Sequence, residues 1–127
     1  MIILDTNVLI FDSLFPKKLS VKAKKILASE TSFACSDISI FELAMLLAKK
    51  RIEVDSESGI FIKAVLTARK IKVLSITPEI AVLSQSFKTK HKDPADLIIA
   101  ATAIHHGVSL LSADEALRNM EGLDCLW

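Results

Sequence analysis

The chain has 127 residues, of which 51% are hydrophobic and 24% are charged. A chain of this length folds as one domain and can bury about two-thirds of its unfolded surface, so it needs neither a disulfide nor a structural metal to fold. Sixteen Lys and Arg side chains nearly balance fifteen Asp and Glu, and the net charge of +1 by itself points to no nucleic-acid partner. We therefore interpret residues 1–127 as a single domain.

Short apolar segments alternate along the chain with segments whose apolar residues recur at helical spacing. The predicted strands are 2–5, 32–36, 72–76, 108–112 and 123–126. The predicted helices are 6–14, 20–30, 37–51, 60–70, 78–87, 94–106 and 113–120. Pro16 ends the first helix, and Gly107 follows the sixth, where glycine tolerates the left-handed conformation of a helix end.

This alternation predicts an α/β fold: a three-layer α/β/α sandwich with a central, mainly parallel sheet of about five strands. The first strand is apolar without alternation, as expected for a sheet covered on both faces. Ligands in such folds bind outside the carboxyl ends of the strands. Functional side chains are therefore expected at that edge.

The N-terminus and the cysteines indicate a cytoplasmic protein. The apolar residues 1–4 are followed at once by Asp5, with no basic region before them, which does not match a signal peptide. No apolar stretch is long enough to span a bilayer. Cys35 and Cys125 are expected to be reduced thiols, with a single cystine as the alternative.

The lysines and arginines form three stretches along the chain. Their simplest interpretation is solvated helix ends, and a nucleic-acid contact becomes the better one only if they surround a site that cleaves phosphodiester bonds. The stretches are Lys17, Lys18, Lys22, Lys24 and Lys25; Lys49, Lys50 and Arg51; and Lys88, Lys90 and Lys92.

Four acids lie close to predicted strand ends or helix starts. Asp5 closes the first strand, and Asp114 lies two residues after the fourth. Glu42 is in the first turns of the helix after the second strand, and Asp96 is in the first turn of the helix at 94–106. In a parallel sheet, the three acids that follow strand ends meet at one edge, and Asp96 sits at a helix start that can face the same edge.

Each acid taken singly has a simpler explanation. The segments 39–42 and 112–115 match the capping-box pattern. Asp93 is expected to cap the helix at 94–106, where the helix dipole also favours Asp96. The capping explanation is weakest for Asp5, because a carboxylate that ends an apolar, covered strand is costly to bury without a partner.

Taken together, the four acids favour a metal site. Carboxylates that meet at one edge repel one another unless a cation lies among them. Oxygen ligands suit Mg²⁺ or Mn²⁺ better than zinc or copper. The pattern therefore predicts one or two such ions, which phosphoryl-transfer chemistry uses to bind substrate phosphate.

Four motifs resemble, in order and spacing, those of PIN-domain nucleases over nearly the whole chain. They are DTNVLI at 5–10, SIFEL at 39–43, DPADLIIAATA at 93–103 and SAD at 112–114. Size and composition point to the VapC-type toxins, the RNA-cutting half of prokaryotic toxin–antitoxin pairs. The resemblance implies an endoribonuclease that hydrolyses RNA phosphodiester bonds, with a small antitoxin protein as partner.

The resemblance also implies roles for particular residues. The implied catalytic residues and metal ligands are Asp5, Glu42, Asp96 and Asp114, and the implied supporting groups are Asn7, Asp93 and Ser112. Leu97 and Ala113 stand where many relatives carry Arg and a basic or polar residue. Contacts with RNA phosphate are therefore expected from Lys90, His91 and Lys92.

The helices at 37–51 and 60–70 carry more apolar residues than one core face uses. This predicts a homodimer contact or an antitoxin groove, because large exposed apolar patches mark interfaces. The alternative is a thick core with tilted helices. The residues concerned are Phe41, Met45, Leu46, Phe61, Ile62 and Leu66.

Four other functions stay open. The first is a PIN-type nuclease in RNA processing outside a toxin–antitoxin pair, and the second is a nuclease that acts on DNA flaps. The third is a phosphoacceptor signalling domain, which normally has paired acids after the first strand, whereas here Thr6 and Asn7 follow Asp5. The fourth is a non-catalytic binding module, against which the presence of all four acids counts.

Overall fold

The computed structural model of the chain describes residues 1–90 and 93–127. One five-stranded sheet runs through its centre in the order β3-β2-β1-β4-β5, and every neighbouring pair is parallel. The strands are β1 (Ile2–Leu4), β2 (Phe33–Ser36), β3 (Lys72–Leu74), β4 (Ser109–Leu111) and β5 (Cys125–Leu126). The predicted parallel α/β architecture is confirmed.

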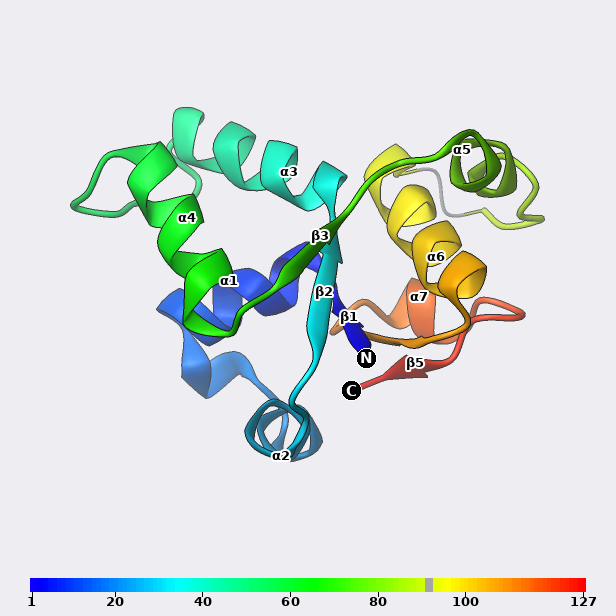
Figure 1. The fold of residues 1–127 in the computed structure, drawn as a ribbon, viewed down its shortest axis with the longest axis horizontal. Helices are drawn as coiled ribbons and strands as arrows, with labels where there is room; N and C mark the ends of the chain where they lie inside the picture. Colours follow the sequence, from blue (N-terminus) through cyan, green and yellow to red (C-terminus); the bar gives the residue numbers. More distant parts are fainter. Residues whose placement is uncertain (91–92) are drawn as a thin grey trace.

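Helices cover both faces of the sheet, with α1 to α4 on one side and α5 to α7 on the other (Figure 1). The helical elements are α1 (Thr6–Leu14), η1 (Pro16–Lys18), α2 (Val21–Ser29), α3 (Asp37–Ala48), α4 (Ser58–Ala68), α5 (Pro78–Ser84), α6 (Pro94–His106) and α7 (Glu115–Arg118). Among the described residues, no helix is both long and apolar enough to cross a membrane.

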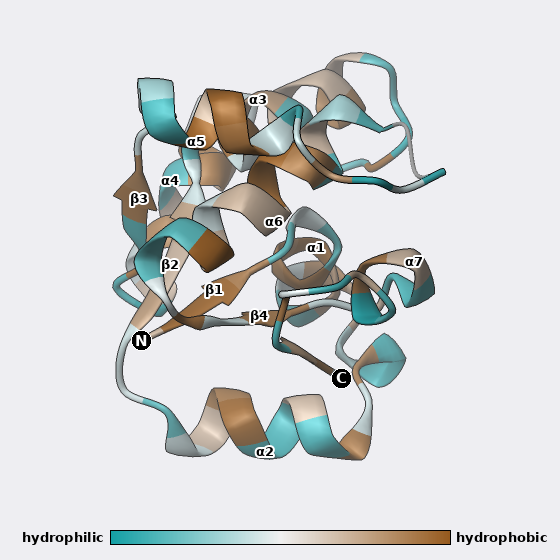
Figure 2. Cartoon of the chain, turned by 90° about the vertical axis from the view of Figure 1, so that its right-hand side faces the viewer, coloured by the Kyte–Doolittle hydropathy of each residue, from teal (hydrophilic) through white to brown (hydrophobic). Residues whose placement is uncertain are grey.

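The central strand β1 divides its side chains between two cores. Ile2 and Leu4 pack in the cluster on the α1 to α4 side, whereas Ile3 packs with Ile99 of α6 on the other side. All three β1 side chains are at most 9% exposed, and Figure 2 shows β1 and β4 coloured as hydrophobic. Full burial of one such side chain stabilises the fold by about 1.5–3 kcal/mol, so β1 is fixed from both faces.

Most predicted elements are present but shorter than expected. Helix α3 ends at Ala48, not at residue 51, because Lys50 adopts a positive φ of 55° that a helix cannot continue through. Helix α7 covers Glu115–Arg118 only. Helices α1 and α6 match their predicted bounds, and Gly107 ends α6 with a φ of 65° as expected.

The cysteines are both free, in line with the prediction of reduced thiols. Burial raises the pKa of Cys35 to about 12 and that of Cys125 to about 11. Such thiols are unreactive at neutral pH, because the thiolate is the reactive form.

The helices α3 and α4 give most of their apolar side chains to the core. Ile62 is buried, Met45 is half-buried, and three more of the predicted interface residues pack partly buried against the core: Leu46, Phe61 and Leu66. Phe41 is 62% exposed. The prediction of a broad exposed patch on these helices is therefore wrong, since the thick-core alternative accounts for five of its six residues.

Arg69, directly after α4, connects three helical elements. Its guanidinium forms a bidentate ion pair with Asp12 of α1, in which Nη2 donates to Oδ1 at 2.8 Å and Nε donates to Oδ2. Its Nη1 donates to the carbonyl oxygen of Leu27 in α2 at 2.8 Å. A planar fork with several donors is needed for this arrangement, and lysine cannot supply it.

We predict that Arg69→Lys lowers the free energy of unfolding by about 1–2 kcal/mol, because a single ammonium replaces the forked, charge-assisted bonds. Urea unfolding of wild type and variant measures the loss. Arg118→Lys is the matched control: its pair with Glu115 spans 3.6 Å and the Glu115 side chain is 86% exposed, so the change should stay within about 0.5 kcal/mol. Equal effects of the two substitutions would contradict the prediction.

Candidate active site

The Asp5 carboxylate lies at the carboxyl end of β1, buried to 2% exposure. It caps α1, and its Oδ1 accepts a hydrogen bond from the Thr6 backbone N–H at 2.7 Å. Its Oδ2 accepts from the Ser112 hydroxyl at 2.6 Å. Burial raises the pKa of Asp5 to about 7, the Ser112 and Thr6 hydrogen bonds oppose that rise, and the charges of Asp96 and Glu42 add to it.

Glu42 joins Asp5 through a single residue. The Thr6 hydroxyl lies 2.5 Å from Glu42 Oε1, to which it donates, and 2.9 Å from the Ser39 hydroxyl on the same helix. Burial raises the pKa of Glu42, the Thr6 hydrogen bond lowers it, and the charges of Asp96 and then Asp93 raise it further. Thr6 therefore holds two acids at once, one with its backbone and one with its side chain.

Helix α6 brings Asp96 within electrostatic range of both of these acids. Asp93 caps the helix, with its Oδ1 accepting from the Ala95 backbone N–H at 3.0 Å, and Asp96 lies in the first turn. The charge of Asp96 raises the pKa of Asp5 and of Glu42 alike. Three of the four predicted acids thus form one electrostatic group.

Asp114 is linked to the group through Ser112. The Ser112 hydroxyl, which donates to Asp5, also accepts from the Asp114 backbone N–H at 3.0 Å. The pKa of Cys125 is raised first by burial and then by the charge of Asp5, with Asp114 adding a smaller effect. Asp5 and Asp114 therefore lie close enough to act on the same thiol.

Neither of the two capping-box alternatives holds in the structure. Ser36, not Ser39, caps α3, because that helix begins at Asp37. Ser39 is instead buried inside the helix beside Thr6. Asp114 itself caps α7, accepting from the Ala116 backbone N–H at 2.9 Å. Neither Ser39 nor Ser112 caps a helix. The Ser112 hydroxyl instead donates to Asp5, and the Ser39 hydroxyl accepts from Thr6, which also holds Glu42.

Thr6 and Ser39 are the site residues that the sequence did not single out. Thr6 stands between two residues of the first motif, and Ser39 stands one helical turn before Glu42. This spacing places Ser39 and Glu42 on one face of α3. That shared face was the available signal, but their partner Thr6 lies 33 and 36 residues away along the chain.

The donor set fits a hard divalent cation. Its charged groups are carboxylates, and the charge of Asp96 raises the pKa of Asp5 and of Glu42, an effect that a cation between them would oppose. Asn7 follows in the first turn of α1, and its buried Oδ1 accepts no hydrogen bond from the described residues. An unsatisfied buried carbonyl oxygen of this kind suits a cation or its bound water.

The described acids, histidines and cysteines include no group of three that stands ready to hold an ion together. Mg²⁺ does not require such a group, since it keeps several waters and takes only one or two protein carboxylates directly. The acids therefore fit a water-rich site better than a closed protein shell.

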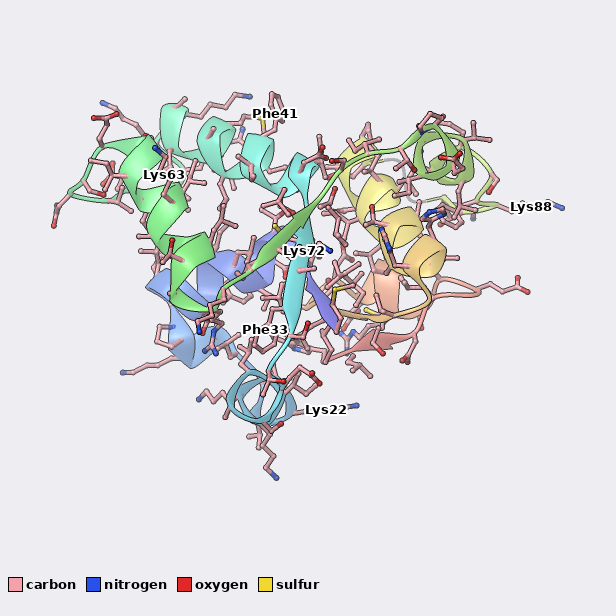
Figure 3. The ribbon with its side chains drawn as sticks, in the orientation of Figure 1. Lys22, Phe33, Phe41, Lys63, Lys72 and Lys88 are labelled. Atoms are coloured by element: carbon pink, nitrogen blue, oxygen red, sulfur yellow. The ribbon has the colours of Figure 1, made fainter. Side chains whose placement is uncertain are left out.

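The three basic stretches lie in different places. Lys22 projects from α2 at the end of the sheet where β2 begins, and α3, which carries Glu42, starts at the opposite end (Figure 3). Lys49 to Arg51 follow the far end of α3. Lys88 and Lys90 line a cavity together with Ala116, next to Asp114. His91 and Lys92, also predicted to contact RNA, lie outside the described residues.

With this geometry in view, the comparisons define the class of protein. The family model of the PIN domain matches residues 2–123, and the chain belongs to the PIN-domain family. Ribonuclease VapC22 of Mycobacterium tuberculosis (strain ATCC 25618 / H37Rv) is 32% identical over 119 residues, which cover 93% of this chain and 90% of that relative.

Solved structures share the fold over nearly the whole chain. FitAcB from Neisseria gonorrhoeae superposes with a TM-score of 0.71 at 21% identity, covering 100% of this chain and 97% of that one. VapBC2 from Rickettsia felis, bound to a DNA fragment from its promoter, gives 0.70 at 18% identity, covering 99% and 98%. VapC20 of Mycobacterium tuberculosis, a sarcin-ricin loop cleaving toxin, gives 0.68 at 13% identity, covering 98% and 99%.

The raised pKa of Asp5 predicts a pH-dependent stability for metal-free protein. The folded state keeps the proton up to about pH 7, whereas the unfolded state loses it near 3.8. The contribution of Asp5 to the free energy of unfolding is therefore most favourable at low pH. Between about pH 4 and 7 this contribution falls, by at most about 4 kcal/mol.

Asp5→Asn removes this titration and keeps the shape of the side chain. In EDTA, the difference in free energy of unfolding, variant minus wild type, should rise between pH 4.5 and 7.5, as measured by urea unfolding. Asp55→Asn, in an exposed loop, is the control and should show no such rise. A flat difference for Asp5→Asn would show that Asp5 ionises as easily in the folded chain as in the unfolded one.

Proposed function

We propose that this PIN-domain protein is a metal-dependent endoribonuclease that hydrolyses RNA phosphodiester bonds. The observation that carries the proposal is the grouping of Asp5, Glu42 and Asp96 at the carboxyl edge of β1, where each of the first two has its pKa raised by the third. Asp114 joins them through Ser112. The similarity to a named ribonuclease over most of the chain supports RNA as the substrate.

The four acids would hold one or two Mg²⁺ or Mn²⁺ ions, directly or through water, with Asn7 and Asp93 beside them. A bound ion of this kind lowers the pKa of a water molecule and neutralises charge on the reacting phosphate. The protein's own part is positioning. Thr6 orients Asp5 and Glu42, Ser112 orients Asp5, and Lys90 offers a positive charge for the neighbouring phosphates.

We further propose that the protein is the toxin of a toxin–antitoxin pair with a small antitoxin as partner. Its structural neighbours include a toxin–antitoxin complex from Klebsiella pneumoniae, which has a TM-score of 0.68 at 23% identity. A neighbouring reading frame for a small DNA-binding protein would support this assignment. An isolated gene would favour a role in RNA processing instead.

A homodimer is the assembly that we propose for this toxin. Phe41 projects outward from α3 (Figure 3) and is 62% exposed. Burying one aromatic side chain of this size on a second copy contributes about 1.5–3 kcal/mol. The exposure of Phe41 thus supplies an anchor for a contact between copies.

We predict that wild type cleaves RNA with Mg²⁺ or Mn²⁺ and stops in EDTA. Asp96→Asn should lower cleavage by more than about 100-fold, because even outer-shell partners in metal sites contribute about 10–100-fold. Added Mg²⁺ should raise the melting temperature of wild type and leave that of Asp96→Asn nearly unchanged, because only a cation bound by the folded state stabilises it.

The control variant is Asp55→Asn, which removes one carboxylate from an exposed loop. It should cleave RNA and respond to Mg²⁺ as wild type does. Matched RNA and DNA strands distinguish a ribonuclease from a nuclease that acts on DNA. Undiminished cutting in EDTA by protein free of contaminating nuclease would defeat the metal mechanism.

We predict that Phe41→Lys converts the homodimer to a monomer, because a charge in place of the aromatic ring cannot be buried in the contact. Light scattering after size-exclusion chromatography measures the mass. Val21→Lys, at a position on α2 that is 71% exposed, should leave the mass unchanged. A monomeric wild type, or a Phe41→Lys variant that stays dimeric, speaks against this interface.

A further inference from the structure

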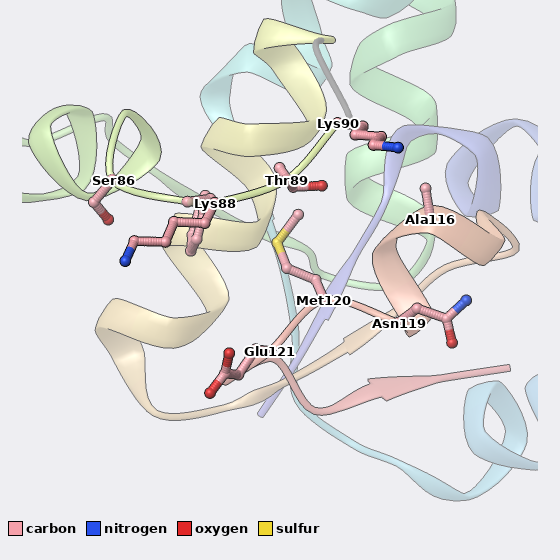
Figure 4. A pocket seen from close by; sticks show the side chains of 9 residues that line it. Ser86, Lys88, Thr89, Lys90, Ala116, Asn119, Met120 and Glu121 are labelled. Atoms are coloured by element: carbon pink, nitrogen blue, oxygen red, sulfur yellow. The ribbon is translucent and has the colours of Figure 1, made fainter.

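A cavity of about 900 Å³ opens beside the acidic edge (Figure 4). One wall is the segment 86–90, which precedes α6, and the other is 116–121, made of α7 and the turn after it. Sites for small molecules have volumes of about 300–1,000 Å³. The cavity is therefore large enough to hold a nucleotide.

Each wall of the cavity has one end next to a proposed site residue. The backbone N–H of Ala116, on one wall, donates to Asp114 Oδ1 at 2.9 Å. Lys90, on the other wall, is three residues before Asp93, and at about 3.8 Å between consecutive Cα atoms the two Cα atoms are within about 11 Å. An RNA strand with one phosphate at the acids would place a neighbouring nucleotide in this cavity.

The interior and the rim of the cavity differ in chemistry. Met120 is 8% exposed and reaches into the space between the walls (Figure 4), and Phe87 is half-buried. Together they present an apolar surface on which a base can pack. Lys88 and Lys90 are exposed, and neither takes part in an ion pair among the described residues. Their charges are available to phosphate.

The polar side chains of the 116–121 wall are Asn119 and Glu121, which project to opposite sides of Met120 (Figure 4). Both side chains are exposed on the 116–121 wall, and no hydrogen bond found in the described chain uses the Asn119 amide group. An asparagine amide reads a base through paired donor and acceptor, and a glutamate accepts from an exocyclic amino group. Cytosine, adenine and guanine carry such an amino group, and uracil does not.

We propose that this cavity binds one unpaired nucleotide of the RNA next to the scissile phosphate, and prefers a base with an exocyclic amino group. The base packs against Phe87 and Met120, Glu121 accepts a hydrogen bond from its amino group, and Lys88 and Lys90 neutralise the adjoining phosphates. A paired base cannot bind in this way, because its faces are stacked and its edge is occupied. The role in cleavage rests on the proposed function, whereas nucleotide binding is testable without it.

The test uses binding of cytidine and uridine 5′-monophosphate to metal-free, isotope-labelled protein, followed by NMR. Saturable shifts are expected at the amides of 88–90 and 119–121, with tighter binding of the cytidine nucleotide. Glu121→Ala should weaken cytidine binding by about fivefold and uridine binding less, as expected for the loss of one hydrogen bond. Lys88→Ala with Lys90→Ala should weaken both nucleotides by more than fivefold.

The matched control is Lys22→Ala with Lys24→Ala, which removes the same charge from α2 at the other end of the sheet. It should bind both nucleotides as wild type does. Shifts that avoid both walls, or an equal loss in the control, would overturn the cavity site. Equal binding of the two nucleotides, unchanged by Glu121→Ala, would overturn the base preference.

Cleavage assays keep this proposal distinct from the nuclease assignment. A wild type that cuts RNA, with unchanged rate and sequence preference in the Lys88, Lys90 and Glu121 variants, retains the ribonuclease and rejects the cavity. A wild type that binds nucleotide in the cavity and cuts no RNA with Mg²⁺ or Mn²⁺ rejects the ribonuclease, and with it any role of the cavity in cleavage.

Discussion

The burial of the Asp5 carboxylate is the constraint on which this structure depends. A carboxylate at 2% exposure is tolerated only when donors satisfy its oxygens or a cation offsets its charge. Thr6 supplies one donor from the next residue, and Ser112 supplies the other from 107 residues away. The second bond forms only when β4 lies beside β1, so the charged group and the strand order require each other.

The order of the strands brings the other acids of the site next to Asp5. Strand β1 lies between β2 and β4, so the residues after it meet α3 on one side and the segment leading to α7 on the other. Helix α6 packs on the same edge and adds Asp96. Burial is the largest cause that raises the pKa of Asp5 and of Glu42, and the charge of Asp96 raises both further. An edge where carboxylates gather in this way is suited to a cation and, through it, to a phosphate.

The two ends of the sheet are electrostatically different, although the chain is nearly neutral overall. Lysines of α2 surround the end where the strands begin, and the acids occupy the end where they finish. Lys88 and Lys90 precede α6 in the chain and line a cavity together with Ala116, which lies next to Asp114. An RNA strand attracted to these lysines is brought beside the carboxylates, which would repel it without a bound cation.

The sequence by itself determined the alternation of strands and helices, because apolar spacing reports which face of each segment is covered. Local signals also placed α1 and α6 correctly, since the Asp93 cap and the positive φ of Gly107 depend only on near neighbours. The order of four acidic motifs indicated the family. It also implied a supporting role for Ser112, but it did not show what Thr6 and Ser39 contact, and local pattern assigned Ser39 to a helix cap.

Only the tertiary structure decided those roles, and the extent of the core. Thr6 meets Glu42 and Ser39 across more than thirty residues, and Ile62 of α4 is buried where its helix pattern predicted an interface. Both outcomes follow from which elements pack together. A hydroxyl can accept from a nearby backbone N–H as a helix cap or donate to a distant carboxylate, so its partner is chosen by the strand order, which spacing along the chain does not encode.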